Sequence, residues 1–502
     1  MAVITSVTYR FCVNGEFTEI MEAKRGIRQG DPISPLLFVI MMEYMNRIMS
    51  RLQQNLGFKH HSKCARIGLT HLTFADDVLL FSRGDYQSIE LLLTAFREFS
   101  ESTGLVVNPH KCKMFCSGMD EDTVKRIKSL SGFSSGSLPV RYLGIPLTSK
   151  KLSIAQYLPL IERIVGKIRH WTTKLLSTAG RIQLVKSVTT AVAQYWMSCF
   201  PIPKGVLHKI DAICRAFIWA GKEESKKSPM AWKIVCTPVR KGGLNIINLD
   251  VWNQIAVLKC LWNISMKRDN LWVRWVHAYF LKKKSLHDAQ VNSNTTWMLK
   301  AIMGAREKIC CYQPLWDQMM ATNNFNMKKM YDKAMILTDE VNWKHLIQRN
   351  YARPRAVLYL WLSCHGRLAT KARLKRFGFI HDDVCALCNL AVENIGHLLF
   401  ECSKTSMIWK EVLNWLGINR QPQCWDLELE WLKSSTKSKS NSAGILKIAI
   451  TETIYELWSY RNAVIFGNST DNRIQAKNII DVIVYRGWAH HKYRKSIAML
   501  FM

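Results

Sequence analysis

Two adjacent carboxylates, Asp76 and Asp77, interrupt an apolar stretch that runs from Leu72 to Phe81. Neighbouring carboxylates repel each other, so the pair is costly unless a cation neutralises it. In a turn between two strands the pair would lie at a sheet edge, where Mg²⁺ could bind it together with phosphate oxygens. Two-metal nucleotidyl transfer needs such a pair and a third carboxylate from another strand. A solvated hairpin turn is the alternative interpretation.

A second cluster has the residue types and spacing of a zinc site: Cys385, Cys388, His397 and Cys402. The Cys-x2-Cys end is typical of a knuckle around one side of a tetrahedral Zn²⁺, and the histidine and the last cysteine would close the other side. A cysteine-rich helical hairpin without metal is the alternative.

The charge balance points to a polyanionic partner. Lys and Arg number 70 against 38 Asp and Glu, which gives a net charge of +32. Such an excess repels itself in a compact fold unless a polyanion is near, and nucleic acid is the commonest one. With 48% hydrophobic residues the chain has material for packed cores, and 502 residues predict several domains.

The 15 cysteines are scattered over the chain, and its start does not resemble a secretory signal. The longest apolar run near the start is too short to span a bilayer. We therefore predict no membrane association, an intracellular location in nucleus or cytoplasm, and reduced thiols.

The elements that must position these residues can be predicted from local patterns. The stretch 7–20 alternates around Asn14-Gly15, which predicts a hairpin. Ser34 and Pro35 predict the cap and start of a helix to about Gln54. A second hairpin is expected over 69–81, a helix over 86–102, and short strands at 105–107, 114–116 and 142–147. From about residue 153 the pattern is helical, with helices expected at 155–178, 180–199, 204–220, 249–266 and 270–280.

Further segments around the acidic pair point to a family. Arg25 to Phe38, Gly104 to Cys112 and Tyr142 to Leu147 occur in the order and at the spacing of reverse transcriptase palm motifs. The match resembles plant-type non-LTR (LINE-type) retrotransposon enzymes. Leu358 to Phe379, followed by the Cys/His cluster and Trp409, resembles the zinc-binding domain of the same proteins. The resemblance covers roughly residues 5–420.

The resemblance implies catalytic roles. Asp76 corresponds to the metal-binding aspartate of the Ala-Asp-Asp motif, with Asp77 beside it, and both would bind Mg²⁺ or Mn²⁺. Lys111 matches a lysine that helps pyrophosphate to leave, although a solvated lysine is an equally good interpretation.

Substrate contacts are implied in the same way. Gly26, Arg28, Gln29 and Gly30 would line the nucleotide pocket, although Arg28 is also consistent with a solvated loop. The residues Tyr142, Leu143 and Gly144 resemble the primer-grip hairpin, for which a plain core strand is the alternative. The implied partners are an RNA template, a DNA primer or target, and deoxynucleoside triphosphates.

The sequence also departs from the family pattern. The palm strand that carries the other catalytic aspartate should precede the 7–20 hairpin, yet no residue before Val7 is acidic. The fingers segment, an endonuclease segment and a ribonuclease H module are not recognisable either. Asp31 and Asp85 are not obvious substitutes for the first aspartate. We therefore expect that this chain alone does not polymerise.

Together these patterns predict an α+β fold. Residues 1–148 would form a partial polymerase palm, an antiparallel sheet with helices that lacks its first catalytic strand and its fingers. A mostly α-helical thumb or connector is expected over 149–345, a small zinc-binding module over 346–420, and a linker with C-terminal helices over 421–502.

The leading functional hypothesis is a truncated RNA-directed DNA polymerase. The first alternative is a non-catalytic nucleic-acid-binding remnant that acts through the basic thumb and the zinc module, and the second is a decayed element without a stable product. The segment before the zinc ligands favours backbone contact with nucleic acid, unless it is a solvated basic face. Its basic residues are Arg367, Lys371, Arg373, Lys375 and Arg376.

Overall fold

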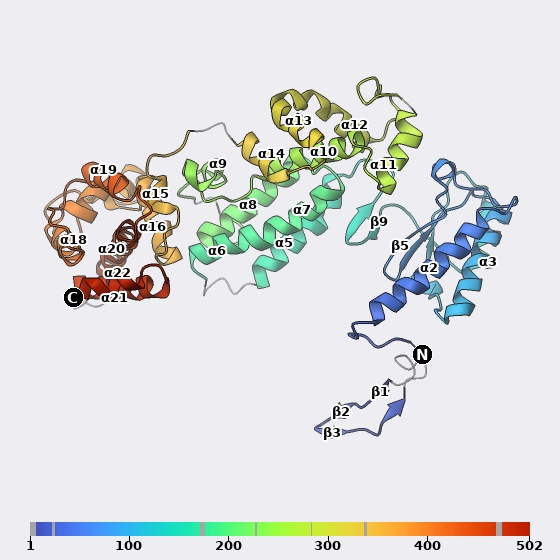
Figure 1. The fold of residues 1–502 in the computed structure, drawn as a ribbon, viewed down its shortest axis with the longest axis horizontal. Coiled ribbons are helices and arrows are strands. Elements are labelled where there is room, and N and C mark those ends of the chain that lie inside the picture. The colour runs from blue at the N-terminus through green and yellow to red at the C-terminus, as the bar shows by residue number, and fades with distance from the viewer. Residues whose placement is uncertain are drawn as a thin grey trace. The chain divides into compact units, whose positions relative to one another are not determined.

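The computed structural model describes residues 7–22, 26–170, 176–225, 228–282, 284–335, 339–467 and 474–501 (Figure 1). The chain divides into two compact units. The first unit comprises Met1–Lys151 and Asn263–Thr295, and the second comprises Leu152–Trp262 and Thr296–Met502. None of the helices within the described ranges has the length and apolar character needed to cross a membrane.

The first unit combines short strands with a few helices, in agreement with the predicted α+β class. Its strands are β1 (Thr8–Tyr9), β2 (Cys12–Val13), β3 (Glu16–Phe17), β4 (Met21–Glu22), β5 (His71–Phe74), β6 (Asp77–Leu80), β7 (Lys113–Met114), β8 (Ser134–Ser135), β9 (Val140–Tyr142) and β10 (Ile145–Leu147). Its helices are α2 (Ser34–Leu52), α3 (Tyr86–Thr103), α4 (Glu121–Ser131) and α11 (Leu271–Trp275), with short 3₁₀ helices at Ala65–Ile67 and Pro109–Lys111 and a π-helix at Val276–Leu281.

The two predicted hairpins are confirmed. Strands β2 and β3 pair antiparallel around Asn14 and Gly15, which both have positive φ. Strands β5 and β6 pair so that Phe74 faces Asp77, which leaves Ala75 and Asp76 as the turn. In the described part of the chain every sheet has two strands, and the β7–β8 pair is parallel.

Three local predictions need correction. Helix α2 begins at Ser34 itself, with Ile33 as its cap, and the Ser34 hydroxyl donates to the Arg28 carbonyl (2.6 Å) rather than accepting from an amide of the first helical turn. The stretch 105–107 is not a strand, since none of the described strands pairs with it. Residues 142–147 are not one strand but part of the β9–β10 hairpin, which turns at Leu143 and Gly144.

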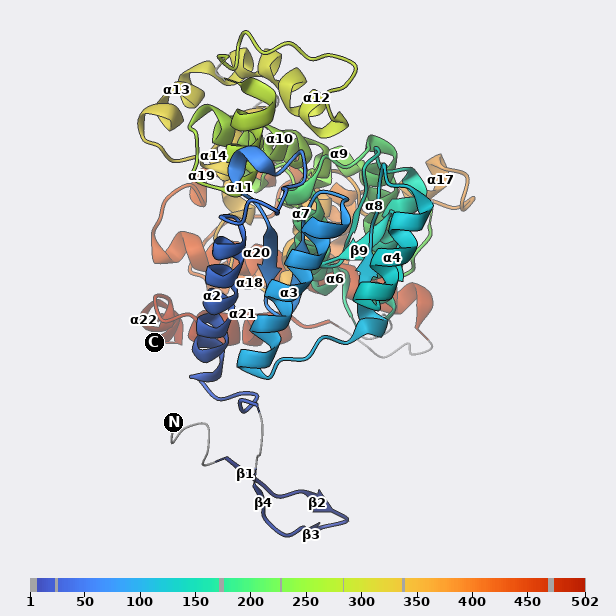
Figure 2. The same cartoon turned by 90° about the vertical axis from the view of Figure 1, so that its right-hand side faces the viewer.

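Helices α2 and α3 lie side by side and form the core of this unit with the β5–β6 hairpin (Figure 1, Figure 2). Val78 and Leu80 pack against this core, while Asp77 and Leu79 alternate with them along β6. The hairpin is therefore anchored on one side by apolar burial, which fixes the place of the turn. The core consists of Met45, Ile48, Met49, Leu52, Phe58, Leu92, Ala95 and Phe99.

The second unit is helical in its described residues. Its first part contains α5 (Leu158–His170), α6 (Thr178–Leu184), α7 (Thr190–Cys199), α8 (Lys204–Ala220), α9 (Trp232–Val235), α10 (Leu249–Ser265), α12 (Trp297–Gly304), α13 (Gln313–Ala321), α14 (Met327–Ala334) and α15 (Lys344–Ile347). Its second part contains α16 (Pro354–Cys364), α17 (Lys371–Arg376), α18 (Ser403–Trp415), α19 (Trp425–Ser435), α20 (Asn441–Phe466), α21 (Ala476–Ala489) and α22 (Arg494–Ala498). The predicted helices near 180–199, 204–220 and 249–266 are confirmed. Part of the one predicted over 155–178 lies outside the described residues.

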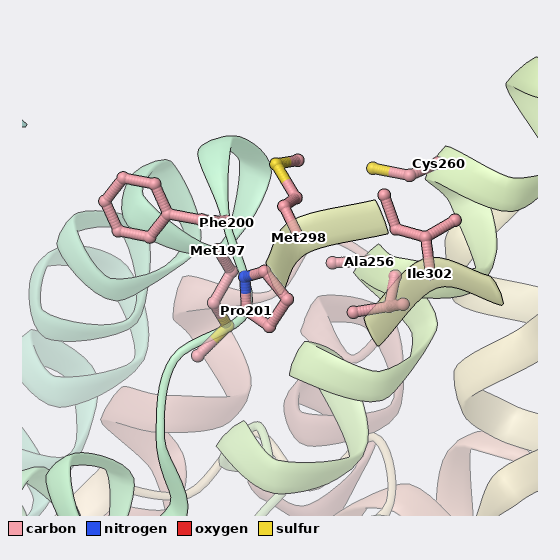
Figure 3. A pocket seen from close by; sticks show the side chains of 8 residues that line it. Met197, Phe200, Pro201, Ala256, Cys260, Met298 and Ile302 are labelled. Carbon is pink, nitrogen blue, oxygen red and sulfur yellow. The ribbon is translucent and has the colours of Figure 1, made fainter. Parts of the chain in front are cut away.

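An apolar pocket lies between α7, α10 and α12 (Figure 3). It is lined by Met197, Phe200, Pro201, Ala256, Val257, Cys260, Met298 and Ile302. Burial raises the pKa of the Cys260 thiol, which keeps the single reactive group of this lining in its neutral form. The pocket is thus a packing feature of the helical unit and offers no charged group to a ligand.

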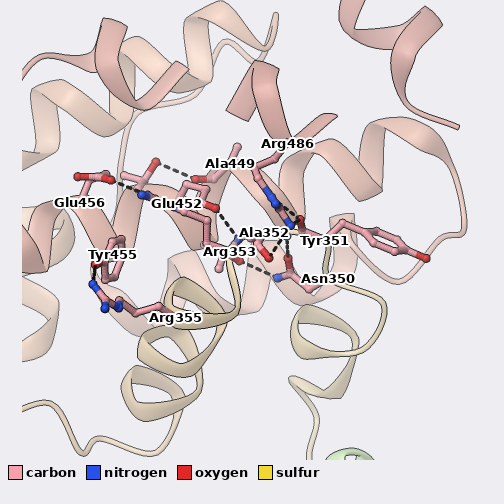
Figure 4. A network of polar contacts seen from close by, with 12 residues as sticks. Asn350, Tyr351, Ala352, Arg353, Arg355, Ala449, Glu452, Tyr455, Glu456 and Arg486 are labelled. Atoms are coloured by element: carbon pink, nitrogen blue, oxygen red, sulfur yellow. Dashed lines mark hydrogen bonds and ion pairs between the residues drawn. The ribbon is translucent and has the colours of Figure 1, made fainter. Parts of the chain in front are cut away.

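A polar network fixes α16 to the long helix α20 (Figure 4). The Arg353 backbone and guanidinium both donate to the buried carboxylate of Glu452 (2.7 Å each), and the guanidinium also pairs with Glu456. Arg355 donates to the Tyr455 hydroxyl, and Arg486 of α21 donates to the Tyr351 carbonyl. These contacts hold the segment before the zinc ligands against the C-terminal helices.

Candidate functional site

The acidic pair lies at the tip of the β5–β6 hairpin. Both Asp76 and Asp77 are exposed, and Ala75 before them has a φ of 50°, a left-handed conformation that is unusual for alanine. The hairpin therefore presents both carboxylates to solvent at one end of a packed element. This arrangement can bind a cation together with oxygen atoms from a ligand.

Tyr142 is the predicted primer-grip residue that the structure places near this pair. Burial, and then the negative charge of Asp77, raise the pKa of the Tyr142 phenol. The β9–β10 hairpin thus comes within electrostatic reach of the carboxylates, with Leu143 and Gly144 in its turn. The sequence motifs did not reveal this proximity, because 65 positions separate the two residues in the numbering of the chain.

The predicted nucleotide-pocket segment forms a loop before α2. Gly26 and Gly30 have φ values of 87° and 90°, which only glycine adopts without strain. Arg28 and Gln29 between them are exposed. Arg25 lies outside the described residues. Lys111 ends a short turn, is exposed, and makes no ion pair with Asp76 or Asp77 within the described ranges.

A third carboxylate does not join the acidic pair. Among the described residues, groups of three or more metal-binding side chains are limited to the Cys/His cluster. Asp31 accepts a hydrogen bond from the Ile33 backbone (3.0 Å), and Asp85 caps α3 by accepting from Ser88 (2.9 Å). Both nearby candidates therefore have local structural roles.

The structure brings the four predicted zinc ligands together. One ligand atom from each of Cys385, Cys388, His397 and Cys402 lies within 4.8 Å of all the others. The Cys388 sulfur is 3.2 Å from Nε2 of His397, and Cys385, His397 and Cys402 are buried. Sulfur and nitrogen atoms grouped in this way fit a tetrahedral Zn²⁺ with bonds of about 2.0–2.3 Å.

Backbone hydrogen bonds hold the four zinc ligands in position. The Cys385 amide donates to the Ala391 carbonyl (2.7 Å) and its carbonyl accepts from Asn389, which adopts a left-handed φ of 57°. The Cys402 amide donates to the His397 carbonyl (2.8 Å), and α18 begins directly after Cys402. Both pairs of ligands therefore sit on tight turns.

A hydrogen bond links the thiols of Cys385 and Cys402. A hydrogen bond with Cys402, followed by burial, raises the pKa of Cys385 to about 12. The same hydrogen bond lowers the pKa of Cys402 to about 7. Cys402 is thus readily available as a thiolate, the form in which cysteine binds zinc.

The buried carboxylate of Glu393 stabilises the segment that carries the zinc ligands. Glu393 lies between Cys388 and His397 in the chain and accepts from the Arg461 guanidinium of α20 (3.0 Å to Nε). It also accepts from the Lys371 amide at the start of α17 (2.9 Å) and from the Ala386 amide (3.4 Å). One side chain thereby joins the knuckle, α17 and α20. The sequence carried no signal for this contact, since Arg461 lies far beyond the zinc motif.

The predicted basic segment is only partly free. Lys371 pairs with Asp382 (2.8 Å) and Lys375 with Asp383 (3.0 Å). Arg367, Arg373 and Arg376 form no ion pair among the residues described. Two of the five predicted basic side chains are therefore engaged by aspartates, and contact of this segment with nucleic acid stays a prediction.

Two protein families match separate parts of the chain. Residues 2–147 match the family described as reverse transcriptase (RNA-dependent DNA polymerase), and residues 325–409 match the family described as zinc-binding in reverse transcriptase. The first match contains the acidic pair and the second contains all four zinc ligands.

Individual relatives point the same way. A protein of Arabidopsis thaliana named as a ribonuclease H protein is 22% identical over 70% of both chains. A Pol polyprotein of the retrotransposable element R2DM from Drosophila melanogaster is 27% identical over 50% of this chain, and one of the element R2 from Popillia japonica is 25% identical over 43%. This chain spans only 23% and 35% of those two relatives. Both domain matches occur in their expected order, and the chain is therefore similar to the reverse transcriptases of non-LTR retrotransposons.

Proposed function

We propose that the first unit supplies part of the active site of an RNA-directed DNA polymerase. In this proposal Asp76 and Asp77 hold Mg²⁺ or Mn²⁺, which would activate the primer 3′-hydroxyl and neutralise the phosphates of a deoxynucleoside triphosphate. Gly26, Arg28, Gln29 and Gly30 line the nucleotide pocket, and Lys111 assists the leaving pyrophosphate. Tyr142, Leu143 and Gly144 position the DNA primer on its RNA template. The presentation of both carboxylates at the exposed tip of the β5–β6 hairpin is the observation that carries the proposal.

We further propose that residues 1–502 do not complete the metal site on their own. Two-metal transfer requires a bridging carboxylate from another strand. The described residues provide no third donor beside Asp76 and Asp77. Outside the described ranges Asp471 is the one acidic residue. The missing carboxylate would therefore come from another segment or another chain.

The domain roles follow as part of the same proposal. Residues 1–148 would act as palm, 149–345 as thumb or connector, 346–420 as zinc-binding module and 421–502 as supporting helices. Zn²⁺ held by Cys385, Cys388, His397 and Cys402 would stabilise the fold of the module, because four protein ligands leave no open position for chemistry.

Iron-directed cleavage tests the metal role without requiring catalysis. Fe²⁺ would replace Mg²⁺ in a complex with an RNA template and DNA primer. Added hydrogen peroxide would oxidise it to Fe³⁺, and the hydroxyl radicals released there would cut the nucleic acid beside the metal. The expected result is cleavage near the primer 3′ end that is lost in an Asp76→Asn, Asp77→Asn variant. An Asp122→Asn variant serves as control, because Asp122 is an exposed carboxylate of the same unit. Cleavage unchanged in the double variant would overturn the proposal.

A second candidate function is nucleic-acid binding without polymerisation. It is favoured by the net charge of +32 and by the arginines beside the zinc ligands. Binding of an RNA–DNA hybrid that is independent of Asp76 and Asp77, without any iron-directed cleavage, would support this function over the first.

A further inference from the structure

The end of α17 combines positive charge with exposed aromatic rings. We use the name Arg/Phe surface for Arg367, Arg373, Arg376, Phe377 and Phe379. Phe377 caps the end of the helix and Phe379 follows two positions later, and these residues are 55% and 69% exposed. Both residues therefore offer aromatic surface to the solvent.

The arginines of this surface lie close together without acidic partners among the described residues. The neighbouring aspartates Asp382 and Asp383 are already engaged by the two lysines. Burial, and then the positive charges of Arg367 and Arg376, lower the pKa of Arg373. Three mutually repelling guanidinium groups are stabilised most by an anion with several charges.

The backbone holds the two rings outward. The Phe379 amide donates to the Leu374 carbonyl (3.0 Å) and the Gly378 amide to the Lys375 carbonyl (2.9 Å), which is the Schellman ending of a helix. In that ending the residue at the position of Phe379 commonly packs against the helix, yet here the ring remains exposed. Its exposure therefore serves no packing role.

The Phe377 ring lies against two of the arginines. The guanidinium carbons of Arg373 and Arg376 lie 5.4 and 5.7 Å from the centre of the Phe377 ring. Aromatic rings bordered by arginines can stack on bases while the arginines contact phosphates. Double-stranded nucleic acid offers phosphates to such a surface but keeps its bases stacked within the helix.

We propose that the Arg/Phe surface binds a single strand of RNA or DNA, with bases on Phe377 and Phe379 and phosphates on Arg367, Arg373 and Arg376. The proposal does not depend on the palm assignment, because every residue of this surface belongs to the second unit. The molecule bound here would be a single-stranded nucleic acid, whereas Cys385, Cys388, His397 and Cys402 would bind only a metal ion.

Fluorescence anisotropy with the zinc-loaded full chain provides the test. The probes are labelled oligouridine, labelled oligothymidine and a duplex of equal length. A Phe377→Ala, Phe379→Ala variant should bind the single strands on the order of tenfold or more weakly, because each stacked base adds substantially to affinity. A Phe377→Tyr, Phe379→Tyr variant should retain binding, and binding of the duplex should be unchanged in both.

The matched control is Phe466→Ala, which removes an equally exposed ring elsewhere in the second unit. Zinc content and thermal unfolding of all variants should equal those of the parent. If the double alanine variant loses affinity for only one of the two single strands, the strand that is lost identifies RNA or DNA as the ligand. Parental affinity of the double alanine variant for both single strands would overturn the proposal, as would an equal loss for the duplex. Because every residue changed here lies in the second unit, a loss of single-strand binding does not bear on the metal role proposed for Asp76 and Asp77.

Discussion

The acidic hairpin and the zinc module differ in where their ligands come from. All four zinc ligands lie between residues 385 and 402, and backbone turns gather them around one point. The acidic pair is equally local, but the two-metal chemistry proposed for it requires a further carboxylate from another strand. A site whose ligands share one short segment can be complete within that segment, whereas a palm site depends on how distant strands come together.

The two regions also differ in their support. The buried ion pair of Glu393 and Arg461 stabilises the segment of the zinc ligands. Two further buried glutamates of this unit form ion pairs with Arg420 and Arg353. The ion pair of the α2–α3 layer, Arg51 with Glu98, is exposed instead. Buried pairs are costly to break, while exposed ones contribute little.

The largest effect is expected from loss of a zinc ligand. Cys402→Ser should abolish zinc binding and unfold the module around residues 385–402, because a structural zinc contributes on the order of 10 kcal/mol to folding. Zinc content by elemental analysis and limited proteolysis measure the effect. Cys424→Ser is the control, since Cys424 is exposed and stands outside the cluster. A zinc-free Cys402→Ser protein that resists protease like the parent would contradict a structural role.

The next largest effect is expected from the buried ion pair. Arg461→Met leaves the Glu393 carboxylate buried without its partner, which should destabilise the second unit by about 3–5 kcal/mol. Adding Glu393→Gln should restore part of the loss. Arg51→Met, the exposed control, should cost about 1 kcal/mol or less. The free energy of unfolding is measured with denaturant. Equal losses of this free energy for Arg461→Met and Arg51→Met would contradict the difference between the two regions.

A small effect is expected when the acidic pair is neutralised. Asp76→Asn, Asp77→Asn should change the free energy of unfolding by no more than about 0.5 kcal/mol, because both side chains are exposed at a hairpin tip. Thermal unfolding in the absence of divalent cations is the measurement. A clear stabilisation would show that the carboxylates repel each other strongly in the folded chain, and a clear loss would show an unrecognised partner.

The smallest effect concerns the titration of Tyr142. Its pKa is raised by burial and then by Asp77, since a nearby carboxylate disfavours the phenolate. Asp77→Asn should therefore lower this pKa, but not to the ordinary value, because burial remains. A single fluorotyrosine at position 142 followed by ¹⁹F NMR reports the change. An unaltered titration would separate the β9–β10 hairpin from the acidic pair and remove the support for a shared site.

Local signals predicted much of the fold and both ligand sets. Asn14-Gly15 predicted its hairpin because few residues tolerate two positive φ values, and the spacing of Cys385 to Cys402 predicted a cluster that the turns then gather. The family resemblance supplied the roles of Asp76 and Asp77, which remain predictions.

Distant contacts could not be predicted in the same way. The pairs Glu393–Arg461 and Tyr142–Asp77 join residues whose separation depends on how helices and hairpins pack. The strand expected at 105–107 failed for a related reason, because strand propensity without a partner strand forms no ladder. Composition likewise predicted a basic helix but could not show that Asp382 and Asp383 neutralise its lysines.

Primer extension on an RNA template with Mg²⁺ or Mn²⁺ tests most directly whether the acidic pair is incomplete. The zinc-loaded chain of residues 1–502 would be run beside its Asp76→Asn, Asp77→Asn variant, with binding of the template measured for both. We predict that neither protein extends the primer and that both bind the template equally. Extension by the parent but not by the variant would contradict the account, because a third carboxylate would then complete the site within this chain.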